Sequence, residues 1–241
     1  MTGVEPSRRP MPNWDKTALA SVLFDFGGTL DANGVAWKER FYRLYRDEGV
    51  GIAPERFDPV FYAADDALVG VIPTTLPLRD TVVRLVQSVT ETLGLRNPTL
   101  VERIAERFLE ETLDRLHTNA VLLGRLSCRY RLGVVSNFYG NLAAVCHEVG
   151  LSPFLTVVVD SAHVGCVKPD PRIFFLALAQ LRADPAQAVF VGDSLRRDMA
   201  GARAIGMPHI WLTPGPRQGE GPCCPKDCMV HTLDELLGWL L

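Results

Sequence analysis

Five short apolar runs recur along the chain, and each ends near a small or polar residue. They cover residues 22–26, 132–135, 156–159, 188–191 and 209–212. None alternates strictly between apolar and polar positions, which is typical of strands that are buried on both faces of a parallel sheet. The runs therefore predict the strands of a parallel sheet.

Helical patterns lie between these runs. Residues 171–181 place five apolar residues on one face: Ile173, Phe174, Ala177, Leu178 and Leu181. Asp170 is a candidate N-cap for this helix, and Pro171 suits its first turn. A short strand near Val230 and a helix over 233–240 close the chain. The alternation of strand and helix predicts a doubly wound α/β core.

The stretch from about 35 to 116 breaks this alternation, because it carries helical patterns and no good strand. One helix places four apolar or aromatic residues on a single face: Trp37, Phe41, Leu44 and Tyr45. Another begins at Asn97-Pro98 and repeats apolar residues along 101–116. Such a stripe lines a pocket or packs into a core, and packing is the more common outcome. We therefore predict an all-helical segment inserted after the first strand.

The predicted organisation has three parts. A flexible N-terminal tail covers residues 1–19, and a Rossmann-like core of doubly wound parallel sheet covers 20–33 and 117–241. An inserted helical cap covers 34–116.

Composition and charge narrow the function. The chain has 241 residues, 47% of them hydrophobic and 22% charged, with a net charge of -3. This balance gives no basic surface for nucleic acid. No apolar run approaches the roughly 20 residues that span a bilayer, and the first nineteen residues lack the apolar stretch of a signal peptide. We therefore expect a cytoplasmic protein with no membrane or nucleic-acid partner.

Six cysteines are present, and three of them crowd into the segment GPCCPKDC. Cys223, Cys224 and Cys228 with His231 or His209 are one possible zinc site. The spacing is not CxxC, however, and no second pair completes four ligands. Free thiols on a loop are therefore favoured over a metal site.

Four polar segments contain candidate functional residues. Each lies at or after the end of a predicted strand, at the sheet edge where ligands bind in open α/β folds. Asp25 ends the first strand and is followed by Gly27, Gly28 and Thr29. Glycines allow the main chain to approach a ligand closely. Taken alone, the segment is as consistent with an ordinary turn as with a site.

Two further segments have equally simple structural explanations. Ser136 and Asn137 lie between a strand and a helix, where they hold phosphate oxygens or cap the helix. Lys168 precedes a proline-initiated helix and would usually be solvated. Asp193 and Asp198 follow the fourth strand, and two carboxylates are costly to bring together unless a cation neutralises them. Taken alone, metal binding and helix capping explain this pair about equally well.

Taken in order, DxxGT, the serine after a strand, Lys-Pro and GDSxxxD resemble the four motifs of the haloacid dehalogenase-like hydrolase superfamily. The resemblance covers the core, about 20–33 and 117–241, and the helical insertion has the position of that family's cap. It implies that Asp25 is a covalent nucleophile on a phosphate ester, with Lys168 as its catalytic partner.

The resemblance also implies the ligands of the site. Mg²⁺ would be held by Asp25, the Gly27 main-chain carbonyl, Asp193 and Asp198. The phosphate oxygens of a small phosphorylated metabolite would be bound by five residues: Gly28, Thr29, Ser136, Asn137 and Lys168.

Position 27 departs from the family pattern. Phosphatases of the family usually carry a second Asp there as general acid and base, which is worth about 10²–10⁴-fold in rate. Three alternatives remain: a phosphatase in which a cap residue or a reactive substrate compensates, a 2-haloacid dehalogenase or phosphonate hydrolase, and a weakly active or non-catalytic binding protein. On the phosphatase interpretation, Gly27→Asp is expected to raise activity on alkyl phosphates.

Three observations weigh these alternatives. A haloacid dehalogenase has no need of Asp193 and Asp198 together. A phosphonate hydrolase needs a cap lysine, and Lys38 is the only lysine between 34 and 116. Asp31 lies six residues after the nucleophile, where it reaches the leaving group or, as we favour, caps a turn. We therefore predict a Mg²⁺-dependent phosphatase, with substrate and oligomeric state left open.

Overall fold

A six-stranded parallel sheet forms the centre of the computed structural model, which describes residues 15–215 and 228–241. The strand order is β3-β2-β1-β4-β5-β6. The strands are β1 (Ser21–Phe24), β2 (Arg131–Ser136), β3 (Leu155–Asp160), β4 (Ala188–Gly192), β5 (His209–Leu212) and β6 (Cys228–Val230). The order reverses next to β1, so the chain winds outward in both directions from the middle of the sheet. The predicted fold class is confirmed.

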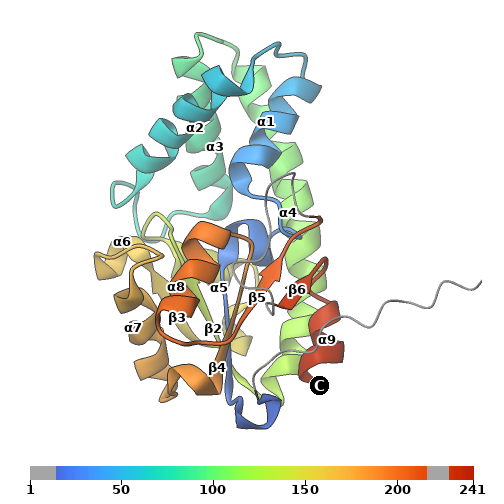
Figure 1. The fold of residues 1–241 in the computed structure, drawn as a ribbon. Coiled ribbons are helices and arrows are strands. Elements are labelled where there is room, and N and C mark those ends of the chain that lie inside the picture. Colours follow the sequence, from blue (N-terminus) through green and yellow to red (C-terminus); the bar gives the residue numbers. More distant parts are fainter. Residues whose placement is uncertain (1–14, 216–227) are drawn as a thin grey trace, which may run out of the picture.

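Helices surround this sheet and extend beyond one end of it (Figure 1). After β1 come α1 (Trp37–Asp47), α2 (Pro54–Leu68), α3 (Leu78–Thr92) and α4 (Pro98–Ser127). The remaining helices are α5 (Leu142–Glu148), α6 (Ser161–Val164), α7 (Pro171–Leu181), α8 (Ala200–Ala204) and α9 (Glu235–Leu240). We call α1–α3 and the first half of α4 the helical insertion.

Alternate residues of β1 point to opposite faces of the sheet. Val22 and Phe24 join a core that includes residues of α4, α5 and α9, while Leu23 joins a second core with α7 and α8. All three side chains are completely buried. This is why the apolar runs lack alternation: both faces of the strands are covered.

The helix α7 follows the sequence pattern closely. Asp170 accepts a hydrogen bond from the Arg172 N–H at 2.9 Å, as an N-cap does, and Pro171 occupies the first turn. The five apolar residues predicted for its inner face are all buried. The predicted boundaries and cap of this helix are confirmed.

The helix α4 passes from the helical insertion to the core without a break, and Figure 1 shows it alongside both. Asn97 caps its start by accepting a hydrogen bond from the Leu100 N–H at 3.1 Å. Buried residues continue past 116, with Leu116, Leu122 and Leu126 all on the inner face. The predicted boundary between 116 and 117 therefore falls inside one continuous helix.

The aromatic stripe of α1 belongs mainly to the core of the helical insertion. Phe41 stacks on Phe108 of α4 with ring centroids 4.1 Å apart, and Tyr45 is completely buried. Trp37 packs edge-on against Phe108, with centroids 5.1 Å apart. Packing therefore explains the stripe, as expected, although Trp37 has a second role at the site described below.

Parts of the predicted tail and of the cysteine segment lie outside the described residues. These are residues 1–14, and Cys223 and Cys224 of the possible zinc site. At the end of the predicted tail, Asp15 caps a short turn and Leu19 is buried against the core. Among the described helices, none has the length and apolar character needed to cross a membrane.

Candidate active site

The carboxyl ends of three neighbouring strands meet at a cavity of about 570 Å³. Asp25 follows β1, Ser136 ends β2, and Asp193 follows β4. Lys168 reaches the same cavity from the loop before α7, and the helical insertion lines its other side. The cavity therefore lies between core and insertion, at the sheet edge where the sequence places the site.

Asp25 is held by its main chain and by two side chains. Its N–H donates to the Val191 carbonyl at 2.9 Å, which fixes the residue beside β4. Its Oδ1 accepts a hydrogen bond from the Ser136 hydroxyl at 2.7 Å and lies 2.7 Å from Lys168 Nζ. Both contacts use the same oxygen, so Oδ2 is the oxygen that is positioned to meet a substrate.

Three carboxylates converge at this point. Asp25, Asp193 and Asp198 each offer an oxygen, and the three oxygens lie within 4.8 Å of one another. Lys168 Nζ lies 2.6 Å from Asp198 Oδ1, so this one cation bridges Asp25 and Asp198. One ammonium group therefore faces three acidic side chains, which leaves an excess of negative charge.

The ionisation of these groups reflects that excess. Burial raises the pKa of Asp198 to about 6, even though Lys168 opposes the shift. Burial, together with Asp198 and Asp25, raises the pKa of Asp193 well above its usual range. Burial opposes the charge on Lys168, but its ion pairs with Asp198 and Asp25 still raise its pKa. A further cation would stabilise the charged form of all three carboxylates.

The donor set fits a hard divalent cation such as Mg²⁺, which takes oxygen ligands. Asp193 is the carboxylate that Lys168 does not pair with, and its Oδ1 accepts a hydrogen bond from the Thr29 hydroxyl at 3.1 Å. Gly27, whose carbonyl is a predicted ligand, lines the same cavity. The structure thus brings the three predicted carboxylate ligands together.

Three predicted phosphate-binding residues have contacts within the protein. The Asn137 side chain accepts from the Lys168 N–H at 2.7 Å and donates to the Lys168 carbonyl at 3.2 Å, so it positions the lysine. The Thr29 hydroxyl bonds to Asp193, as noted above. The Gly28 N–H donates to Asp31 Oδ1 at 2.6 Å. The partners of Asn137 and Thr29 come from distant segments and could not be inferred from the motifs, whereas Asp31 is only three residues from Gly28.

The indole of Trp37 covers Gly27. A Cβ atom added at this position would lie 3.3 Å from Trp37 Nε1, closer than such contacts normally are. The Trp37 N–H donates to Asp31 Oδ2 at 2.5 Å, which fixes the ring in place. A side chain at position 27 would therefore press on Trp37 of the insertion, and the indole would have to shift by a few tenths of an ångström.

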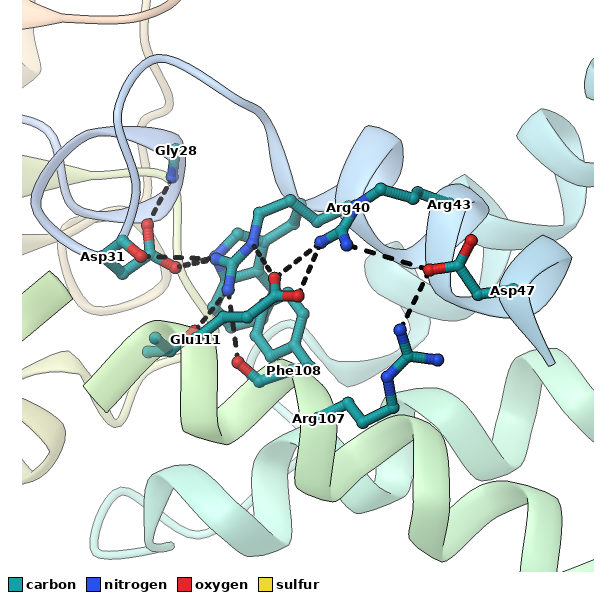
Figure 2. Close-up of polar contacts among 10 residues, drawn as sticks. Gly28, Asp31, Arg40, Arg43, Asp47, Arg107, Phe108 and Glu111 are labelled. Carbon is teal, nitrogen blue, oxygen red and sulfur yellow. Dashed lines mark hydrogen bonds and ion pairs between the residues drawn. The ribbon is translucent and has the colours of Figure 1, made fainter. Parts of the chain in front are cut away.

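Asp31 is completely buried and binds the insertion to the site (Figure 2). Besides the bonds to Gly28 and Trp37, its Oδ2 lies 3.0 Å from Arg40 Nη1. Burial raises the pKa of Asp31, and the Arg40 guanidinium opposes the rise. The expectation that Asp31 caps a local turn captures only the Gly28 contact.

Arg40 is a residue that the sequence analysis missed. It lies three residues after Trp37 and four before Leu44, on the apolar face of α1, and it is buried. A charged residue on an apolar helical face was the available signal, since such a residue is rarely buried unless it is paired.

Comparisons with known proteins agree with these motifs. A family model described as haloacid dehalogenase-like hydrolase matches residues 19–206. Haloacid dehalogenase-like hydrolase domain-containing protein 3 of Bos taurus is 40% identical over 139 residues, which cover 55% of each chain. A phosphoserine phosphatase of Thermus thermophilus is 38% identical over 87 residues, covering 36% of this chain and 34% of that protein. The matches thus span about half or less of these relatives.

Solved structures share the fold over most of the chain. A HAD phosphatase from Thermococcus onnurineus has a TM-score of 0.54 and 24% identity, and the match covers 92% of this chain and 99% of that one. An L-2-haloacid dehalogenase from Xanthobacter autotrophicus, with chloropropionic acid covalently bound, has a TM-score of 0.56 and 16% identity. That match covers 90% of this chain and 96% of the other. At these identities the similarity establishes the fold alone.

Proposed function

The chain belongs to the haloacid dehalogenase-like hydrolase family, and from this premise we propose that it is a Mg²⁺-dependent phosphatase of small phosphorylated metabolites. The observation that carries the proposal is the convergence of Asp25, Asp193 and Asp198 within 4.8 Å, beside Lys168 and Ser136. Curated relatives named as phosphatases support the same reaction class. The predicted cytoplasmic location is part of this proposal.

The proposed reaction begins at Asp25. Its Oδ2 attacks the phosphorus atom, the bond from phosphorus to the ester oxygen breaks, and an aspartyl-phosphate forms. Ser136 and Lys168 hold the other carboxylate oxygen, so the nucleophile is oriented before substrate arrives. Water then attacks the phosphorus atom of the intermediate, which releases phosphate and restores the carboxylate.

Asp25, Asp193 and Asp198 would hold the divalent cation, with the Gly27 carbonyl as a further ligand. Bound there, Mg²⁺ supplies charge neutralisation between an anionic nucleophile and an anionic phosphate. Lys168 contributes a fixed positive charge on the same side of the cavity. It is 3% exposed, so its charge acts in a poorly solvated environment, where electrostatic effects are strong.

We infer that the helical insertion acts as a cap that selects the substrate. Trp37, Tyr62 and Asp65 of the insertion line the cavity, opposite Arg196 and Arg197 of the core. The arginines favour an anionic substrate, and a cavity of about 570 Å³ is the size of a small-molecule site.

A 2-haloacid dehalogenase is the second candidate, because Gly27 lacks the carboxyl group of a phosphatase and dehalogenases of known structure share the fold. Halide leaves without a proton, so this reaction tolerates the glycine. The pair Asp193 and Asp198 counts against it, since an attack on carbon needs no divalent cation to neutralise the substrate.

A substrate screen distinguishes the two candidates. The intact protein is assayed with p-nitrophenyl phosphate and a panel of phosphorylated metabolites, with Mg²⁺ or with EDTA, and separately with 2-chloropropionate. We expect turnover of phosphate esters only with Mg²⁺, and a loss of at least about 10⁴-fold for Asp25→Asn. Asp114→Asn, an exposed matched variant on α4, should retain full activity.

Two results would reject the proposal. Metal-independent release of chloride would favour the dehalogenase, and phosphatase activity retained in Asp25→Asn would remove the nucleophile. Far-UV circular dichroism of both variants checks that the fold is intact.

A further inference from the structure

The proposed phosphatase reaction needs a proton for the departing alkoxide, and position 27 cannot supply it. Gly27 has no side chain, and the Trp37 indole lies against the position where one would begin. Poor leaving groups depart slowly without a general acid, at a cost of about 10²–10⁴-fold. If the proposed function holds, another residue of the cavity must therefore replace the missing acid.

Asp65 of α2 and Tyr139 of the loop after β2 form a hydrogen-bonded pair in the wall of the cavity. The Tyr139 hydroxyl donates to Asp65 Oδ1, and both residues line the same space as Asp25. The ring of Tyr139 lies 6.2 Å from the indole of Trp37, which itself covers Gly27. The pair is therefore connected to Gly27 through the Trp37 indole, and it shares a cavity with Asp25.

Burial makes the protonated form of Asp65 more favourable than it is for an exposed carboxyl group. Burial raises its pKa, while the Tyr139 hydroxyl and the nearby Arg197 oppose the rise and Asp66 adds to it. Burial and the adjacent Asp65 raise the pKa of Tyr139 well above its usual range, so the phenol stays protonated and remains a donor. Since Oδ1 accepts the phenol, Oδ2 is the oxygen available to carry a proton.

Other titratable groups near the cavity are engaged elsewhere. Lys38 Nζ pairs with Glu39 at 2.8 Å and with Asp58 at 3.0 Å. Asp31 is completely buried behind Trp37, and its two oxygens accept hydrogen bonds from Gly28, Trp37 and Arg40. Two carboxyl groups of the described insertion line the cavity. Glu39 is paired with the Lys38 ammonium group, whereas Asp65 accepts a hydrogen bond from the uncharged Tyr139 hydroxyl.

We propose that Asp65, positioned by Tyr139, is the general acid and base of this enzyme. As the bond between phosphorus and the ester oxygen breaks, that oxygen keeps the electron pair and takes the proton from Asp65 Oδ2. Asp65 is left as a carboxylate. In the second step this carboxylate takes a proton from the water that attacks the aspartyl-phosphate, which restores the acid and releases phosphate.

The test is a leaving-group series with the intact protein and Mg²⁺. Phenyl phosphate has a poor leaving group and 2,4-dinitrophenyl phosphate a good one, so only the first depends on an acid. All rates in this test are compared as kcat/KM, which reports formation of the aspartyl-phosphate and not its hydrolysis. We expect Asp65→Asn to lower kcat/KM on phenyl phosphate about 10²-fold or more, and on the dinitrophenyl ester less than about 3-fold. Asp80→Asn, an exposed variant of α3, should leave both rates unchanged.

The pH profile gives an independent readout. The rate on phenyl phosphate should fall as pH rises through the pKa of Asp65, because the acid form is required. This alkaline limb should be absent in Asp65→Asn. Tyr139→Phe removes a hydrogen bond that lowers the pKa of Asp65, so it should move the limb to higher pH.

Each outcome decides the proposal. An equal loss on both esters would show that the pair only holds insertion and core together, which overturns the assignment of the acid and leaves the phosphatase intact. An unchanged alkaline limb in Asp65→Asn would do the same. If the wild-type protein hydrolyses neither ester, the proposed function itself fails, and the acid assignment with it.

Discussion

Two buried clusters of charge lie close to Gly27 and Gly28, and they differ in balance. The carboxylate cluster of the site has three acidic side chains around one ammonium group. The Arg40 cluster comprises Arg40, Asp31 and their hydrogen-bond partners. In it, one guanidinium lies 3.0 Å from the buried Asp31 carboxylate and 3.8 Å from the partly exposed Glu111 carboxylate (Figure 2). Asp25, Asp198 and Lys168 of the first cluster and Asp31 and Arg40 of the second are buried, while Asp193 is partly exposed.

The Arg40 cluster is satisfied by the protein itself. Arg40 Nη1 bonds to Asp31, and Nη2 donates to the Phe108 carbonyl at 3.2 Å and to the Thr112 hydroxyl at 2.8 Å. The guanidinium also lies 4.0 Å from the centre of the Phe108 ring. A buried ion pair with its donors and acceptors matched is a structural feature, whereas an unmatched excess of charge indicates a site that binds something.

The comparison predicts opposite responses to loss of one charge. Arg40→Met should lower the free energy of unfolding by about 3–5 kcal/mol, because Asp31 is left buried without its cation. Urea unfolding measures this effect. Arg43→Met is the matched control, since Arg43 is half exposed and its pair with Glu111 is worth at most about 1 kcal/mol. A loss below 1 kcal/mol for Arg40→Met would show that the cluster contributes little.

The loss of stability caused by Arg40→Met should depend on pH. Burial raises the pKa of folded Asp31, and removal of Arg40 raises it further. A raised pKa means that folded Asp31 binds its proton more tightly than unfolded Asp31, so proton binding stabilises the fold. This stabilisation is fully present below the unfolded pKa and is lost as pH rises through the folded pKa. The cost of Arg40→Met should therefore be smaller at pH 5 than at pH 8. A constant cost across this range contradicts the ionisation of Asp31.

The carboxylate cluster should respond to the cation. We expect Mg²⁺ to raise the melting temperature of the wild-type protein. At a Mg²⁺ concentration 100 times the Kd, the free energy of unfolding should increase by about 2.7 kcal/mol. Asp193→Asn removes one ligand and one negative charge, so this variant should be no less stable without metal and should gain little from Mg²⁺. Differential scanning calorimetry measures both. An equal Mg²⁺ response in the variant would place the cation elsewhere.

Gly27 lines the cavity of the carboxylate cluster and also contacts Trp37, a hydrogen-bond partner of Asp31. A substitution at Gly27 should have the smallest effect on stability. Gly27→Ala should cost about 1 kcal/mol, because the new Cβ pushes on Trp37 and disturbs its bond to Asp31. Gly51→Ala is the control, since Gly51 has open space around its Cβ position. Thermal unfolding compares the two variants.

Position 27 also carries a prediction about activity. From the sequence, Gly27→Asp is expected to raise activity on alkyl phosphates. Trp37 changes that expectation, since an aspartate there would have to displace the indole. We now expect no gain from the single substitution in a phosphatase assay, and an increase would mean that the indole moves aside.

Much of the fold followed from local patterns. The apolar runs predicted β2 to β5 within a few residues, and capping residues predicted the start of α7 and of α4. The first strand ends at Phe24, two residues before the end of the first apolar run, because Asp25 faces the cavity and Phe26 begins the next turn, Phe26–Leu30. Periodicity could be read in this way because burial of a strand or helix face acts within a few residues of sequence.

The motifs also located the residues of the site, but not their partners. Asp25 meets Ser136 at a sequence separation of 111 residues, and Asp65 meets Tyr139 at 74. Arg40 reaches Thr112 across 72 residues. Which donor faces which acceptor depends on how strands and helices pack, so no local pattern contains it.

By itself, then, the sequence determined the strands, the helical insertion and the four polar segments, since each depends on neighbouring residues. Three features required the tertiary structure: the Trp37 indole lies against Gly27, Asp31 is paired with Arg40, and Asp65 lines the cavity. Burial and charge balance depend on which side chains surround a residue in space. Many of those side chains come from distant parts of the sequence and are brought together when the insertion packs on the core.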